Sequence, residues 1–221
     1  MPPSSTWVSV VTLWLVRHGE SSWNTLGLAQ GHNDQARLTH RGLRQAAEAA
    51  ERFRGHPVRA LYSSDLRRAL QTAAAFSAVL ALPVLADARL RERSLGVLEG
   101  TPVAGNGPSV TGLDLAAGRL VDPDARPPGG ESVRDLYQRA AAFCADLAAG
   151  VLPLLEPTGP DGPDAAKTCG DVLVVAHGGT LRVLRACLNG VPVEEMSWEP
   201  LENTVVLQIP DFVTKSRGGI R

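Results

Sequence analysis

The sequence has few cysteines, few aromatic residues and almost no net charge. Of its 221 residues 5% are aromatic, the formal net charge is −1, and the three cysteines are Cys144, Cys169 and Cys187. An odd number of widely spaced cysteines matches neither a disulfide framework nor a zinc site, so we expect a reducing compartment. The balanced charge argues against broad electrostatic binding to nucleic acid or to an anionic membrane.

Long apolar runs are also absent. No stretch approaches the roughly 20 apolar residues of a membrane-spanning helix, and residues 1–9 lack the basic and then apolar order of a signal peptide. The composition, 44% hydrophobic and 20% charged, is ordinary for a globular protein. We therefore expect a cytoplasmic protein that binds no membrane, with residues 1–221 in a single domain. The sequence leaves open whether the protein is a monomer or a homodimer.

Apolar runs alternate with helical periodicities along the chain. The predicted strands are 10–16, 58–62, 83–85, 172–176 and 204–209. The predicted helices are 40–53, 65–81, 133–149 and a helix that follows Gly179. This alternation predicts an α/β fold, a three-layer α/β/α sandwich with a mainly parallel central sheet.

Hydroxyl side chains mark the expected helix starts. Ser63 and Ser64 are placed to cap the second helix, and Ser132 with Asp135 matches a capping box at the start of the third. Thr39 is the expected N-cap of the first helix. The apolar stripe of that helix expected to face the core consists of Leu43, Ala46, Ala47 and Ala50.

Two segments are rich in glycine and proline. Residues 101–130 are predicted to form a lid-like insertion, with one helical turn near 113–117. Residues 156–170 are polar and are predicted to form a mobile loop.

The most informative stretch is residues 13–21, Leu-Trp-Leu-Val-Arg-His-Gly-Glu-Ser. Its apolar strand delivers Arg17 and His18 to a glycine turn. Residues 171–180 repeat this order, with a strand, then His177, then glycines and a helix start. Because ligands of α/β sheets bind at the carboxyl ends of the strands, we expect both histidines in one anionic-ligand pocket, which suits phosphoryl chemistry.

The residue types in this pattern fit a phosphate. Arg17 can donate two parallel N–H bonds, Arg68 lies at a helix start that favours anions, and Gly178 leaves the next helix start open to close approach. A neutral imidazole can attack phosphorus when its other nitrogen donates to a carbonyl. Glu92 is a candidate general acid, although the arginines on either side of it would lower its pKa, so these residues alone leave its role open.

Six blocks in order resemble the histidine phosphatase superfamily in its phosphoglycerate-mutase-like branch, and together they span most of the chain. The blocks are Arg17-His18-Gly19-Glu20-Ser21 with Trp23-Asn24, Leu38-Thr39 with Gly42, Gln45 and Ala46, Ser63-Ser64-Asp65-Leu66-Arg67-Arg68-Ala69 with Gln71-Thr72-Ala73, Leu90-Arg91-Glu92 with Gly96 and Glu99-Gly100, Gly130-Glu131-Ser132, and Val175-Ala176-His177-Gly178-Gly179.

The resemblance implies that His18 is the phosphorylated nucleophile and that Glu92 protonates the leaving group and then activates water. The implied ligands of the transferring phosphoryl group are Arg17, Arg68 and His177. The positions that match contacts with phosphate or substrate are Asn24, Gln30 and Gly31. The family needs neither a metal nor another cofactor. The expected partner is a small phosphate monoester.

Two features favour a phosphatase over a phosphoglycerate mutase of the same family. The mutases carry a tyrosine three residues after the glutamate, where this chain has Leu95. They also carry a long basic insert, whereas residues 101–128 contain two arginines, Arg119 and Arg126, and no lysine. A mutase remains the first alternative and a non-catalytic phosphate-binding module the second. Polar residues of the insertion that suit a sugar phosphate or a phosphoglycerate derivative are Asn106, Asp114, Arg119 and Asp122.

Several of these residues have plainer structural interpretations. Glu92 could pair with a neighbouring arginine, Asn24 could cap a turn, and Arg67 is expected at the surface. The histidines expected at the surface or at caps are His32, His40 and His56. The tryptophans expected to serve packing are Trp7, Trp14, Trp23 and Trp198. Zinc bound by the two strand-end histidines and Glu92 is disfavoured, because the adjacent arginine would repel a cation.

Overall fold

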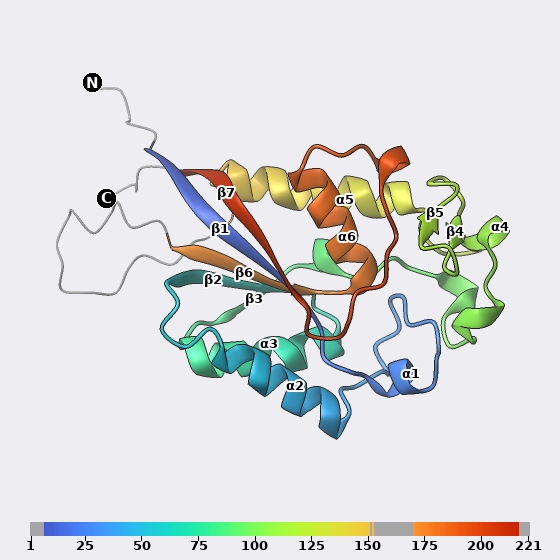
Figure 1. Cartoon of the computed structure of the whole chain (residues 1–221), viewed down its shortest axis with the longest axis horizontal. Coiled ribbons are helices and arrows are strands. Elements are labelled where there is room, and N and C mark those ends of the chain that lie inside the picture. The colour runs from blue at the N-terminus through green and yellow to red at the C-terminus, as the bar shows by residue number, and fades with distance from the viewer. Residues whose placement is uncertain (1–6, 151, 153–169, 217–221) are drawn as a thin grey trace.

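A five-stranded sheet forms the middle layer of the computed structural model, which describes residues 7–150, 152 and 170–216 (Figure 1). The strand order is β3-β2-β6-β1-β7. The strands are β1 (Trp7–Arg17), β2 (Val58–Ser63), β3 (Val84–Ala86), β6 (Asp171–Ala176) and β7 (Val206–Ser216). Neighbouring pairs are parallel except β7, which runs antiparallel to β1. The predicted mainly parallel sheet is confirmed.

Helices cover both faces of this sheet (Figure 1). The helices on one face are α2 (His40–Glu51) and α3 (Arg67–Leu80), and those on the other are α5 (Val133–Ala148) and α6 (Gly178–Leu188). The three-layer α/β/α architecture is therefore confirmed. Within the described residues no helix has the length and apolar character needed to cross a membrane. That residues 1–221 form one domain stays a prediction.

Strand β6 shows why the sheet needs a helical layer on each side. Alternate side chains of a strand point to opposite faces, and Val172 and Val174 belong to the core under α5 and α6. Leu173 and Val175 belong to the core under α2 and α3. All four side chains are fully buried. Burial of each contributes roughly 1.5–3 kcal/mol, so an uncovered face would be strongly unfavourable.

The helix starts agree with the sequence in two cases and differ in a third. Thr39 caps α2 through Gly42 N–H, and Ser132 forms a capping box with Asp135 at α5. Helix α3 begins later than predicted, its N-cap is Leu66, and no side chain caps it. The prediction that Ser63 and Ser64 cap α3 is wrong, because their hydroxyl groups bond elsewhere at the end of β2.

The apolar stripe predicted for α2 is also partly wrong. Leu43 is 44% exposed and Ala47 is exposed, whereas Ala46 and Ala50 are buried as predicted. The remaining buried positions of this helix are Gly42 and Ala49. Small residues face the sheet because the helix packs closely on it, and the larger leucine is left at the surface.

The insertion contains short elements only. These elements are η3 (Val103–Gly105), α4 (Pro108–Thr111), β4 (Leu113–Asp114) and β5 (Arg119–Leu120). The helical turn predicted near 113–117 is wrong, since Leu113 starts a two-stranded hairpin with β5. The remaining short helices are α1 (Ser22–Thr25), η1 (Ala88–Leu90), η2 (Gly96–Leu98) and η5 (Val193–Glu195). The mobile loop predicted over 156–170 lies, apart from Gly170, outside the described residues.

Candidate active site

The two strand-end histidines lie side by side. Arg17, the last residue of β1, pairs in register with Ala176, the last residue of β6. His18 and His177 follow these residues directly, and their ring centroids are 5.2 Å apart. They are 3% and 1% exposed, respectively. Adjacent parallel strands therefore bring together two imidazoles that are more than 150 positions apart in the sequence.

The ring of His18 is oriented for nucleophilic attack through Nε2. Its Nδ1 lies 2.7 Å from Gly19 O. A carbonyl oxygen can only accept, so Nδ1 carries the hydrogen and Nε2 keeps its lone pair. Burial, together with the charges of Arg68 and Arg17, lowers the pKa of His18 well below its ordinary value of 6.5. The imidazole is thus held in its neutral form.

His177 is oriented by a residue that the sequence did not single out for this purpose. Ser64 Oγ accepts from Leu66 N–H at 3.3 Å and lies 2.9 Å from His177 Nε2. The serine hydroxyl satisfies both partners by donating to Nε2, which leaves the hydrogen of His177 on Nδ1. This Nδ1 is buried and has no hydrogen-bond partner.

Buried donors without partners cluster around His18. Among the described residues, four buried side-chain nitrogen or oxygen atoms lack a partner, and three of them are Arg17 Nε, Arg68 Nε and His177 Nδ1. Leaving such groups unpaired is costly, at about 1–3 kcal/mol each. A phosphoryl group with three oxygens would satisfy all of them, so the arrangement is suited to that anion.

Arg68 is held by the chain segment that follows α1. Its guanidinium is fully buried and donates from Nη1 to Asn33 O at 2.9 Å and from Nη2 to Gly31 O at 2.8 Å. Burial lowers the pKa of Arg68 to about 10, so the group stays charged at neutral pH. Arg17 donates from Nη1 to Leu201 O. Arg67 is exposed beside Asp34, as predicted for a surface residue.

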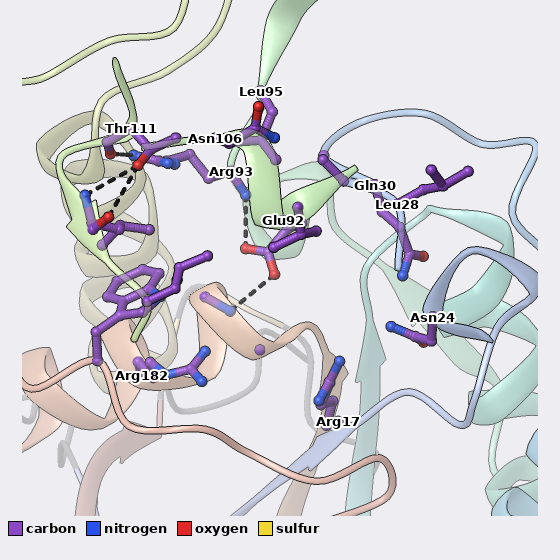
Figure 2. Close-up of a pocket in the computed structure, with 18 of the residues that line it drawn as sticks. Arg17, Asn24, Leu28, Gln30, Glu92, Arg93, Leu95, Asn106, Thr111 and Arg182 are labelled. Atoms are coloured by element: carbon purple, nitrogen blue, oxygen red, sulfur yellow. Dashed lines mark hydrogen bonds between the residues drawn. The ribbon is translucent and has the colours of Figure 1, made fainter. Parts of the chain in front are cut away.

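Glu92 reaches the cavity from the segment that follows η1. Its Oε1 accepts from Arg93 N–H and its Oε2 from Gly179 N–H, both at 2.9 Å (Figure 2). The flanking arginines are committed elsewhere, since Arg91 pairs with Asp65 and Arg93 donates to Thr111 O. The ion pair considered between Glu92 and a flanking arginine is therefore not formed.

Arg139 of α5 fixes the backbone of the Glu92 segment. Its guanidinium donates to Glu92 O, Arg91 O and Arg89 O, each at 2.7 Å. It also forms a paired contact with the Glu131 carboxylate at 3.0 and 2.9 Å. The sequence carries no local signal for the three backbone contacts, because these carbonyls lie 47 to 50 positions from Arg139.

Asn24 and Gln30 combine structural and cavity-facing roles. Asn24 Oδ1 accepts from Ser21 N–H at 3.0 Å, and Gln30 Oε1 accepts from Ser21 O–H at 3.0 Å. Both residues line the cavity opposite Arg182 (Figure 2). Their oxygens are occupied, so their amide N–H groups are the atoms available to a ligand.

The two predicted glycines serve close packing at the cavity. Gly31 has a φ of +48°, and a Cβ there would lie 2.2 Å from Glu99 Oε1. A Cβ at Gly178 would lie 3.1 Å from Arg182 Nη1 and 3.7 Å from Arg17 Nε. Gly31 acts on the site through its carbonyl, which holds Arg68, and Gly178 makes room for two guanidinium groups.

The insertion forms the outer wall of the cavity, whose volume is about 230 Å³. The insertion contributes the lining residues Val103, Asn106, Thr111, Leu113 and Leu115. Leu28, Leu95 and Trp198 line the cavity from other segments. Trp198, expected to serve packing alone, thus also lines the cavity. The polar wall predicted from the sequence is only partly present. Asn106 lines the cavity, but Asp114, Arg119 and Asp122 do not.

No cluster of three or more His, Cys, Asp or Glu side chains within the described residues is arranged to hold a metal ion. That the site works without a metal or another cofactor stays a prediction.

Stability below pH 6.5 should report the two buried histidines. Burial, with nearby arginine charges, lowers the pKa of both His18 and His177 well below 6.5. The unfolded chain therefore binds more protons in this range, and the free energy of unfolding falls as the pH falls, by up to about 1.4 kcal/mol per pH unit for each histidine. Denaturant unfolding between pH 5 and 8, in buffer without phosphate, measures this slope.

A His18→Asn variant should have a shallower slope below pH 6.5, by about one proton. The matched control is His40→Asn at an exposed position, which should leave the slope as it is. Equal slopes in all three proteins would contradict the buried neutral state.

Comparisons with known proteins agree with this fold and geometry. Residues 13–152 match the model of the histidine phosphatase superfamily (branch 1). The chain is 39% identical over 188 residues to a Klebsiella pneumoniae protein named probable phosphoglycerate mutase GpmB, which covers 83% of this chain and 77% of that protein. The predicted resemblance is confirmed, and the chain belongs to the histidine phosphatase superfamily.

Solved structures of similar proteins include a mycobacterial glucosyl-3-phosphoglycerate phosphatase with VO3. It has a TM-score of 0.74 and 32% identity, and covers 93% of this chain and 96% of that chain. Bacillus stearothermophilus YhfR has a TM-score of 0.69 and 29% identity, and covers 90% of each chain. Phosphatases are thus among the structural neighbours of this protein.

Proposed function

We propose that the protein is a metal-independent phosphomonoesterase that acts on small phosphorylated metabolites through a phosphohistidine. The observation that carries this proposal is the group of three unpaired buried donors around a neutral histidine whose Nδ1 is already bonded to Gly19 O. Such a pocket stabilises a transferring phosphoryl group by fixed hydrogen-bond donors and charges.

In the first step His18 Nε2 attacks phosphorus, and the bond from phosphorus to the leaving oxygen breaks. Glu92, in its protonated form, gives its proton to that oxygen. In the second step a water molecule attacks phosphorus, Glu92 takes a proton from it, and the N–P bond breaks. Inorganic phosphate leaves and His18 regains its lone pair, so two easier displacements replace one difficult one.

The cavity wall supports water as the acceptor of the phosphoryl group. Leu95 lines the cavity, and the insertion contributes no charged side chain to the lining. A phosphoglycerate mutase must retain its intermediate and bind it again, and the uncharged side chains that the insertion contributes provide few contacts for this. The mutase is nevertheless the second candidate, because the relative that is 39% identical is named a probable phosphoglycerate mutase.

The substrate class is a small phosphate monoester of the sugar phosphate or phosphoglycerate type. The cavity volume of about 230 Å³ suits a leaving group of a few carbon atoms. The name of the mycobacterial neighbour, a glucosyl-3-phosphoglycerate phosphatase, points in the same direction.

Hydrolysis of nitrophenyl phosphate in the presence of a chelator tests the proposal. We expect release of nitrophenol at an unchanged rate after chelation. Activity lost with the chelator and restored by a divalent metal would contradict the metal-independent route. A protein that releases no phosphate yet interconverts 2- and 3-phosphoglycerate with a bisphosphate primer would be the mutase, and one that only binds phosphate would be the non-catalytic module.

A further inference from the structure

Arg182 places a second cationic group beside the phosphoryl pocket, and the proposed mechanism does not use it. Residues four apart on a helix lie on the same face, and helix side chains lean toward the N-terminus. Arg182 of α6 therefore extends over Gly178, where its Nη1 lies 3.1 Å from the position of a Cβ. Arg17 Nε lies 3.7 Å from the same point. The guanidinium groups of Arg182 and Arg17 thus lie next to each other on the same side of the cavity (Figure 2).

The guanidinium of Arg182 is held on one edge and one face. Its Nε donates to Glu199 O at 2.6 Å, and its central carbon lies 5.1 Å from the ring centroid of the buried Trp198. Among the described residues no hydrogen-bond acceptor is assigned to its Nη groups. The outer edge of the guanidinium is therefore positioned in advance and remains available to a ligand, which lowers the entropic cost of binding.

The charges that line the cavity exceed what a phosphate needs. The charged lining residues are Arg17, Arg68, Arg93, Arg182 and Glu92. Four guanidinium groups face one carboxylate, and a bound phosphate monoester contributes up to about two negative charges. Among the lining side chains alone, one positive charge is left over even when Glu92 is ionised. Arg93 is buried at 3% exposure and its Nη1 donates to Thr111 O in the wall, whereas Arg182 is only partly buried, so Arg182 is the more accessible of these two cations.

We propose that Arg182 binds a carboxylate on the leaving group, so that the preferred substrates are phosphate esters of small hydroxy acids. This inference rests on the phosphomonoesterase function proposed above. A guanidinium edge matches the two oxygens of a carboxylate and donates to them in parallel. Because Arg182 and Arg17 share one side of Gly178, the carboxylate must lie within a few bonds of phosphorus, as in two- and three-carbon acids.

Matched substrate pairs test the carboxylate site. Each pair consists of a phosphorylated acid and the corresponding alcohol, namely 3-phosphoglycerate with glycerol 3-phosphate and phosphoglycolate with hydroxyethyl phosphate. We expect the native protein to prefer the acid of at least one pair in kcat/KM. Arg182→Gln should lower kcat/KM for that acid by about 10- to 100-fold, mainly through KM, as expected for loss of a charge-assisted hydrogen bond. The loss for the alcohol should be severalfold at most.

Arg185→Gln is the matched control, because Arg185 lies one turn further along α6 and does not line this cavity. It should change neither member of a pair by more than about twofold. Equal losses for acid and alcohol in Arg182→Gln would show that Arg182 only supports Trp198 and would overturn the proposal. A native protein without preference for either acid would overturn it too.

Binding measurements separate this inference from the proposed function. Titration calorimetry with a His18→Ala variant records the dissociation constants of the same pairs without turnover. Tighter binding of the acid that disappears in His18→Ala with Arg182→Gln supports the carboxylate site, even if the native protein hydrolyses none of the esters. In that case the phosphomonoesterase proposal fails and the site stands. Equal binding of acid and alcohol overturns the site.

Discussion

Replacement of His18 by alanine should reduce kcat for nitrophenyl phosphate by a factor on the order of 10⁴ or more. The lone pair of His18 Nε2 forms the bond to phosphorus in the proposed first step, and the remaining donors can only bind the substrate. The fold should survive, because the side chain lines the cavity and belongs to neither hydrophobic core cluster. Quenched reactions with an ester radiolabelled on its phosphate should also show an acid-labile, alkali-stable label on the native protein, as expected for phosphohistidine, and no label on the variant.

The control for this prediction is His40→Ala, which removes an exposed imidazole near the start of α2 and should leave kcat as it is. Unfolding curves of both variants check that the loss is chemical. Retention of more than a few per cent of kcat in His18→Ala, with the fold intact, would remove His18 from the role of nucleophile.

Replacement of Glu92 by glutamine should produce a loss that depends on the leaving group. Glutamine has no acidic proton, so the phosphorylation step with alkyl phosphates should slow by about 10²- to 10⁴-fold. Nitrophenolate leaves without a proton, so its burst phase should slow far less. The second step should be slow with either substrate, because water then lacks its base. Pre-steady-state kinetics with radiolabelled esters separates the two steps.

Glu99→Gln provides the matched comparison for Glu92→Gln. Glu99 lies seven positions later, accepts from Leu95 N–H at 3.0 Å and does not line the cavity. Its replacement should affect alkyl and nitrophenyl phosphates by the same small factor. Identical losses of both substrates in the burst phase of Glu92→Gln would exclude Glu92 as the general acid.

The carboxyl ends of β1 and β6 could be predicted well because the signal is local, whereas β7 extends to Ser216, beyond the predicted end at residue 209. A short β-branched apolar run is typical of a strand buried on both faces, and the glycine after His18 or His177 marks where such a run ends. The helix faces were less predictable. Leu43 is the largest apolar residue of its helix, yet it is exposed, since close packing of the helix on the sheet selects small residues. The apolar periodicity of a helix carries no information on how closely the helix packs on the sheet.

The positions of the candidate site residues were predictable where these residues sit on strand ends, and not where they depend on tertiary contacts. Ser64 resembles a helix cap in the sequence, but its hydroxyl bonds His177, 113 positions away. Arg139 and Arg182 look like solvated helix residues. Apart from the Glu131 carboxylate and the Trp198 ring, their partners are backbone carbonyls, which any residue carries, so a pattern of residue types gives little indication of them. Two polar residues of the insertion, Asp114 and Arg119, were wrongly expected in the cavity. They pair with each other instead, with Arg119 Nη2 3.7 Å from Asp114 Oδ2.

The division between the sheet and the insertion has a consequence for redesign. The two candidate catalytic histidines directly follow β1 and β6, whose spacing is fixed by the hydrogen bonds between these strands. Under the proposed function, selectivity for the departing alcohol depends on Arg182 of α6 and on residues 101–130, a contiguous segment that has no strand pairing with the sheet in the described structure. Exchange of this segment for that of another family member should thus retarget the catalyst in one cloning step and leave its reactive half undisturbed.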